Sequence, residues 1–85
     1  MKFLHFELQS GPQRTVTVTL DKQANVKIMD EANFEHYKKG NGHKFHGGFA
    51  TKSPFKVVLP SSGKWHVVID LGGIPGSVKA SVRAN

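Results

Sequence analysis

The sequence predicts an all-β protein, a small antiparallel β-sandwich or flattened barrel of about six or seven strands with one short helix. Two observations predict this fold. Apolar and polar residues alternate in several short segments, which is the period of a half-buried strand. Clusters of Gly, Pro, Ser and Asp separate these segments at short intervals and are typical of turns. With 85 residues and no linker or repeat, the chain is predicted to form one domain over residues 1–85.

Residues 64–71 form the clearest predicted strand, and we expect the others to pack around it. The segment follows a Pro-Ser-Ser-Gly turn at residues 60–63 and ends at two glycines. One of its faces is wholly apolar and the other is half apolar, which predicts a position in the middle of a sheet. The first face carries Trp65, Val67, Ile69 and Leu71, and the second carries His66, Val68 and Asp70.

The other strands are predicted at residues 3–8, 14–20, 24–29, 54–59 and 77–83, with a short strand bent at Gly47 and Gly48. Residues 14–20 alternate most strictly, and we expect their three threonines to point outward. The short gap before residues 24–29 predicts a hairpin, and the glycines of residues 72–76 predict a tight turn. The inward-facing positions predict the core, which comprises Phe6, Val16, Val18, Leu20, Val26, Ile28, Phe55, Val57, Leu59, Trp65, Val67, Ile69, Val78 and Val82.

One short helix is predicted near residues 32–39. Acidic residues open this segment, Lys38 and Lys39 close it and Gly40 follows, which is the charge order and the stop signal of a helix. The helix is only about two turns long, so tertiary contacts must hold it. We expect Phe34 and at least one more aromatic residue of this region to plug one end of the sandwich.

The composition excludes several classes of protein. No cysteine is present, which excludes disulfide scaffolds and thiolate metal sites and favours a cytoplasmic setting. No run approaches the roughly 20 apolar residues of a membrane helix, so we expect no membrane contact. The formal net charge is +6, from 12 Lys and Arg against 6 Asp and Glu. Because the positive residues are spread over different strands, we favour soluble outer faces over nucleic-acid binding, which stays an alternative.

Residues 36–49 are the candidate ligand site. Cations, aromatic rings and glycines coincide in this segment, and loops on a rigid sheet are where binding groups usually lie. Aromatic rings stack on sugars or bases while cations reach phosphate or carboxylate groups. The predicted ligand is therefore a small or extended anion, bound more tightly at low salt and below about pH 6.5. The predicted ligand-binding residues are His36, Tyr37, Lys38, Lys39, His43, Lys44, Phe45 and His46.

The five histidines also raise the question of metal binding or catalysis. His43 and His46 are three apart, a spacing that puts them on opposite faces of a strand, so they reach one ion only from a turn or a helix. We interpret them as surface histidines and predict no metal site and no cofactor. His66 and Asp70 share a strand face but lie roughly 13 Å apart, so we expect a structural His66 that is hydrogen-bonded across the sheet. No serine stands in a nucleophile pattern, and no catalytic residue is predicted.

Several stretches together resemble a small bacterial family described as domain of unknown function 1883. The matching stretches are residues 24–30, 33–34, 37–40 and 52–54, and above all the run PSSGKWHVVIDLGG at residues 60–73. The resemblance covers nearly the whole chain and implies a compact β-sandwich. It also implies that such domains occur alone or as amino-terminal modules joined to signalling domains of the Toll/interleukin-receptor type, which favours recognition over catalysis. The family offers no established activity or functional residues to carry over.

We therefore predict a non-catalytic binding or sensory module with an unidentified anionic ligand. Two alternatives stay open. The first is a protein that binds nucleic acid or acidic glycans through its positive charge, and the second is a small hydrolase-like enzyme, supported only by the histidines and serines. Lysines on several strands discourage open edge pairing, so we expect a monomer or a closed dimer.

Overall fold

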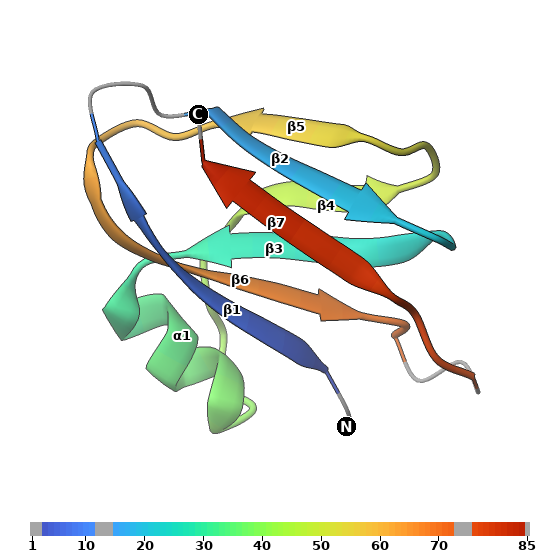
Figure 1. The fold of residues 1–85 in the computed structure, drawn as a ribbon. Coiled ribbons are helices and arrows are strands. Elements are labelled where there is room, and N and C mark those ends of the chain that lie inside the picture. The colour runs from blue at the N-terminus through green and yellow to red at the C-terminus, as the bar shows by residue number, and fades with distance from the viewer. Residues whose placement is uncertain (1–2, 12–14, 73–75, 85) are drawn as a thin grey trace.

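The computed structural model describes residues 3–11, 15–72 and 76–84, which form two antiparallel sheets packed face to face with one helix outside them (Figure 1). The four-stranded sheet has the order β1 (Leu4–Ser10), β6 (Gly63–Asp70), β3 (Ala24–Met29) and β4 (His46–Ala50). The three-stranded sheet has the order β5 (Phe55–Val58), β2 (Thr15–Leu20) and β7 (Ala80–Ala84). Neither sheet closes on itself over the described residues, so the sandwich is confirmed and the barrel is not.

Strand β6 occupies the middle of the larger sheet, as its two-sided pattern predicts. It pairs with β1 on one side and with β3 on the other, and every residue from Trp65 to Asp70 is buried. The inner face of β6 contributes to the core between the two sheets. Most of the predicted core residues are buried there, which confirms the prediction for them. The other predicted core residues are half-buried against this core, and they are Phe6, Phe55, Val57, Val78 and Val82. The fully buried members of this core are Val16, Val18, Leu20, Ala24, Val26, Ile28, Ala50, Leu59, Trp65, Val67 and Ile69.

The predicted hairpin between β2 and β3 is wrong. Strand β2 pairs with β5 and β7, whereas β3 pairs with β4 and β6, so the short connection at residues 21–23 carries the chain from one sheet to the other. The connection contains no Gly or Asn, the residues that tight hairpin turns favour. Strands β2 and β3 belong to opposite sheets, and both bury their apolar faces in the core between these sheets.

The three β2 threonines lie on the face opposite Val16 and Val18, as the alternation predicts, but they differ in burial. Thr17 is buried, because it lies on the central strand of its sheet and pairs with Lys56 on one side and Arg83 on the other. Long side chains therefore flank it on both edges. Thr15 is half-buried and Thr19 is exposed.

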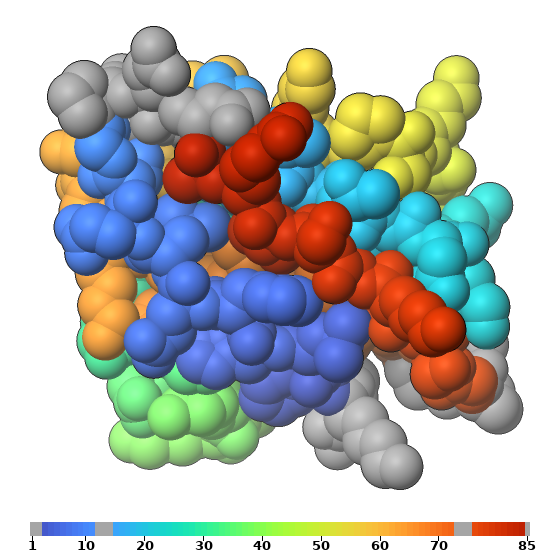
Figure 2. All heavy atoms as spheres, in the orientation of Figure 1, coloured from blue at the N-terminus to red at the C-terminus, as the bar shows by residue number. Residues whose placement is uncertain are grey.

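Helix α1 (Glu31–Lys38) lies against the outer face of the four-stranded sheet, which confirms the predicted helix. The Asp30 side chain caps it by accepting a hydrogen bond from the backbone N–H of Asn33 at 2.9 Å. The predicted plug at the end of the sandwich is wrong, because the outer sheet face is apolar at Met29 and Val68 and needs a cover. Phe34 and Tyr37 supply that cover, with Phe3 packed beside them. The green helix lies directly against the blue β1 strand in the space-filling view (Figure 2).

The observed strand ends differ from the prediction by a few residues. Strand β1 continues to Ser10, β7 begins at Ala80 rather than at residue 77, and the strand with the paired glycines is β4. Gly47 in β4 has a φ of 122°, and a Cβ atom there would lie 2.4 Å from the Val26 carbonyl oxygen, so this position requires glycine. The predicted turn at residues 72–76 falls mainly on residues 73–75, outside the described part. Among the described residues, no helix is long and apolar enough to cross a membrane.

Candidate functional site

A groove of about 760 Å³ opens beside the start of the helix, a volume within the range of small-molecule sites. Three parts of the chain meet there. One wall comes from the end of β3 and the start of α1, a second from the segment before β4, and a third from the turn before β6. The lining residues are Met29, Asp30, Asn33, His43, Lys44, Phe45, His46, Pro60, Ser61 and Trp65.

The segment before β4 is tied to the start of the helix by Asn33. The Asn33 side-chain oxygen accepts a hydrogen bond from the Lys44 backbone N–H at 2.8 Å, and its side-chain nitrogen donates one to Asp30 at 2.9 Å. The Asp30 carboxylate therefore caps the helix and orients the residue that holds the segment. This network places the Lys44 backbone beside the helix N-terminus while the Lys44 side chain stays exposed.

Lys27 lies beneath the same segment rather than on a free outer face. Its ammonium group is 3.3 Å from His43 Nε2 and lies 5.2 Å and 5.1 Å from the ring centroids of Tyr37 and Phe45. An ammonium group only donates, so Nε2 of His43 is an acceptor, and its Nδ1–H donates to the Asn41 carbonyl oxygen at 3.1 Å. Both ring nitrogens of His43 are therefore engaged in hydrogen bonds, which fix the position of its ring in the wall of the groove.

The other side of the groove combines an exposed aromatic ring with an exposed lysine and an exposed imidazole. Phe45 is 41% exposed, and Lys44 and His46 are exposed beside it. The His46 ring meets the edge of Trp65 with centroids 5.7 Å apart, and the Trp65 indole N–H donates to the Ser61 carbonyl oxygen at 3.1 Å. This arrangement can stack on a planar or sugar ring and contact a negative group at the same time.

The structure separates the eight predicted ligand-binding residues into two groups. His43, Lys44, Phe45 and His46 line the groove, whereas the four helix residues do not. His36, Lys38 and Lys39 lie on the exposed helix surface, where Lys38 pairs with Glu35 at 2.9 Å. Tyr37 is 7% exposed, which differs from the prediction that its ring is available to a ligand.

The Tyr37 hydroxyl belongs to a buried network around Asp70 that the sequence did not predict. Asp70 accepts hydrogen bonds at 2.9 Å from the Tyr37 hydroxyl, from the Asn25 side chain and from the Gly72 backbone N–H. Burial opposes ionisation of Asp70, but these three bonds and the nearby charge of Lys27 outweigh it and lower the pKa of Asp70 from its usual value. Burial, together with the bond to Asp70, raises the pKa of Tyr37.

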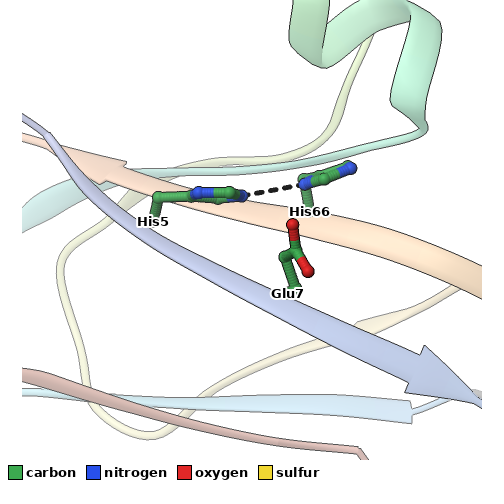
Figure 3. Close-up of side chains that lie close together, drawn as sticks. All are labelled: His5, Glu7 and His66. Atoms are coloured by element: carbon green, nitrogen blue, oxygen red, sulfur yellow. Dashed lines mark hydrogen bonds between the residues drawn. The ribbon is translucent and has the colours of Figure 1, made fainter.

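A second polar cluster lies on the same sheet face, at the edge formed by β1. His66 Nδ1 and His5 Nε2 are 2.8 Å apart, which confirms the predicted hydrogen bond of His66 across the sheet. The other ring nitrogen of His66 contacts the Glu31 carboxylate on the helix. Glu7 lies beside them, and His5, Glu7 and His66 each present one donor atom within 4.8 Å of the others (Figure 3). The pKa of His5 is lowered by its desolvation and then by the neighbouring His66.

The residues that sequence reasoning missed come from distant parts of the chain. His5 and His66 are 61 positions apart, and Asn25 and Asp70 are 45 apart. Only strand register brings these pairs together. The one local signal was the polar second face of the β6 segment, which holds both His66 and Asp70.

The comparison with family models gives a match over the whole chain. The model described as "Domain of unknown function (DUF1883)" matches residues 1–85. The chain belongs to this family. Neither the curated proteins nor the solved structures gave a match to the DUF1883 chain. The family description assigns no activity, so the functional argument rests on the groove and on the polar clusters of this DUF1883 domain.

Proposed function

We propose that this DUF1883 domain is a non-catalytic binding module that holds a small anionic ligand in the groove next to Phe45. The observation that carries the proposal is the exposed Phe45 ring between the exposed Lys44 ammonium group and the exposed His46 imidazole, in a groove of about 760 Å³. A ring and flanking cations together suit a ligand that has a planar or sugar ring and a phosphate or carboxylate group.

The charge balance of the groove supports an anion over a cation. Asp30 is the acidic side chain among the lining residues, and its carboxylate oxygen already accepts two hydrogen bonds from Asn33. Among the described contacts, the Lys44 side chain has no hydrogen-bond or ion-pair partner. Lys27 adds a further positive charge behind His43. A negative ligand group therefore meets Lys44 at the rim, while the Asp30 carboxylate is engaged with Asn33 at the start of the helix.

The proposal of a non-catalytic role rests on what the groove residues already do. Both nitrogens of His43 are engaged with Lys27 and Asn41. Over the ranges that the structure describes, no serine hydroxyl is hydrogen-bonded to a histidine ring, which is the contact that a serine hydrolase uses. These contacts support binding rather than acyl transfer.

A ligand screen with a matched pair of variants tests the proposal. Nucleotides, acidic sugars and single-stranded oligonucleotides are screened by ligand-observed NMR, and the affinity of each hit is measured for the wild type, Lys44→Ala, Phe45→Ala and the double variant Lys38→Ala/Lys39→Ala. We expect affinity to fall about tenfold or more in Lys44→Ala and Phe45→Ala. The double variant removes two helix lysines outside the groove and should bind within about twofold of the wild type.

Two outcomes would contradict the proposal. A hit that binds equally to the wild type and to both groove variants would place the site elsewhere on the molecule. Oligonucleotide binding that depends on Lys38 and Lys39 and not on Phe45 would favour the polyanion-binding alternative, because a backbone contact needs charge and no ring.

A further inference from the structure

We propose that His5, Glu7 and His66 form a binding site for a divalent transition metal such as Zn²⁺. The three side chains offer two imidazole nitrogens and one carboxylate oxygen, all within 4.8 Å of one another. Two imidazoles and a carboxylate form a known ligand set for Zn²⁺ and for other first-row metals, whereas Mg²⁺ and Ca²⁺ prefer oxygen ligands alone. None of the three residues lines the groove.

The strand register positions the three ligands. His5 and Glu7 are two apart on β1 and so project from the same sheet face. Glu7 pairs directly with His66 on β6, and His5 pairs with Val68, one step along the same face. Figure 3 shows the His5 and His66 rings nearly in line, with the Glu7 carboxylate beside the His66 ring. The donor atoms are thus held by two hydrogen-bonded strands and not by a loop.

The surroundings of His66 match those of a metal-bound histidine. Such histidines usually donate their second ring N–H to a carboxylate, which sets the ring orientation and leaves the other nitrogen free to bind the metal. His66 Nε2 contacts the Glu31 carboxylate, so Nδ1 is the nitrogen that faces His5. The Phe34 ring stacks on both imidazoles, with centroids 4.2 Å from His5 and 4.3 Å from His66, and holds the two rings nearly parallel.

The geometry requires only a small adjustment to accept an ion. Tetrahedral Zn²⁺ with bonds of about 2.0–2.1 Å separates two ligand nitrogens by about 3.3 Å. The two nitrogens are now 2.8 Å apart and share a hydrogen bond. His66 is fixed by burial, whereas His5 and Glu7 are exposed, so their side chains can move to meet a common ion. A water molecule at this exposed edge would complete the coordination.

Calorimetric titration of the full chain with ZnCl₂ at pH 7.5 tests the site. We expect one Zn²⁺ per chain, with affinity lowered about tenfold or more in His5→Ala and in Glu7→Gln. The control is the double variant His43→Ala/His46→Ala, which removes the other close histidine pair and should leave zinc affinity within about twofold. MgCl₂ should give no binding at the same concentrations. Circular dichroism of each variant checks that the fold is intact.

Two further readouts separate the proposed site from an adventitious one. Glu31→Gln removes a positioning residue and not a ligand, so zinc affinity should fall about 10- to 100-fold at unchanged stoichiometry. In the wild type, zinc should shift the ¹⁵N resonances of His5 Nε2 and His66 Nδ1. The proposal is overturned if zinc does not bind, if His5→Ala binds as well as the wild type, or if the His43/His46 variant is the one that loses binding.

Discussion

Replacing Tyr37 by Phe should lower the free energy of unfolding by about 1.5–3 kcal/mol, because it removes one hydrogen bond to a buried carboxylate. The hydroxyl donates to Asp70 Oδ2 at 2.9 Å, while Asn25 and Gly72 donate to the other oxygen. The ring itself stays in place against Phe3, with centroids 5.2 Å apart, so the change opens no large cavity. The expected loss of stability therefore comes from the missing hydrogen bond and from Asp70 Oδ2, which no longer has the Tyr37 donor.

The same variant should change how stability responds to acid. The pKa of Asp70 is lower in the folded protein than in the unfolded chain, so the unfolded chain binds the proton first as the pH falls. The ionised carboxylate therefore contributes stability above about pH 4. This contribution is lost as the pH falls through the folded-state pKa. Without the Tyr37 hydroxyl, the pKa of Asp70 moves back toward its usual value. The Tyr37→Phe protein should then lose less stability than the wild type between about pH 4 and pH 2.

Urea unfolding followed by circular dichroism measures both effects. We expect the midpoint to fall at pH 7 with an unchanged dependence on urea concentration. The control is His36→Ala, a neighbouring exposed position on the helix, which should change stability by less than about 0.5 kcal/mol. A Tyr37→Phe change within that same limit would refute the reasoning, because the helix would then not depend on its bond to Asp70.

Three other predictions concern the sheet, the core and the assembly. Gly47→Ala should destabilise the protein by about 1–3 kcal/mol, since its Cβ would lie 2.4 Å from the Val26 carbonyl oxygen, while Gly42→Ala, with nothing within 4 Å, should have little effect in the same urea assay. Ile69→Ala, at a fully buried position, should cost about 2–5 kcal/mol; a change within error would place this face in solvent. Light scattering should give a monomer or a closed dimer, and a large open assembly at low concentration would contradict this.

The strands were predictable because their signal is local. Alternation identified β2 and β3, and the two-sided pattern of residues 64–71 identified a central strand. The pairing of β2 was not predictable in the same way, since a short gap permits either a hairpin or a crossing between sheets. The deciding factor was the shared core, in which the apolar faces of β2 and β3 meet from opposite sides.

The candidate groove was predicted only in its contiguous part. His43 to His46 were found because cations and rings adjoin in the sequence, but Met29, Ser61 and Trp65 join them only in the folded chain. The same local composition also suggested Tyr37, whose burial follows from the apolar outer face of the large sheet. Composition thus located the loop, and the fold selected which of its residues face the groove.

The most direct test of the proposed function uses Trp65, the only tryptophan in the chain and a lining residue of the groove. Two-dimensional ¹H–¹⁵N NMR spectra of the labelled protein are recorded while a hit from the anion screen is added. We expect the Trp65 indole N–H and the Lys44 and Phe45 amides to shift together along one binding curve, and the affinity to weaken with added salt. Shifts confined to the exposed helix surface at His36 and Lys39, with Trp65 unchanged, would contradict the proposed site.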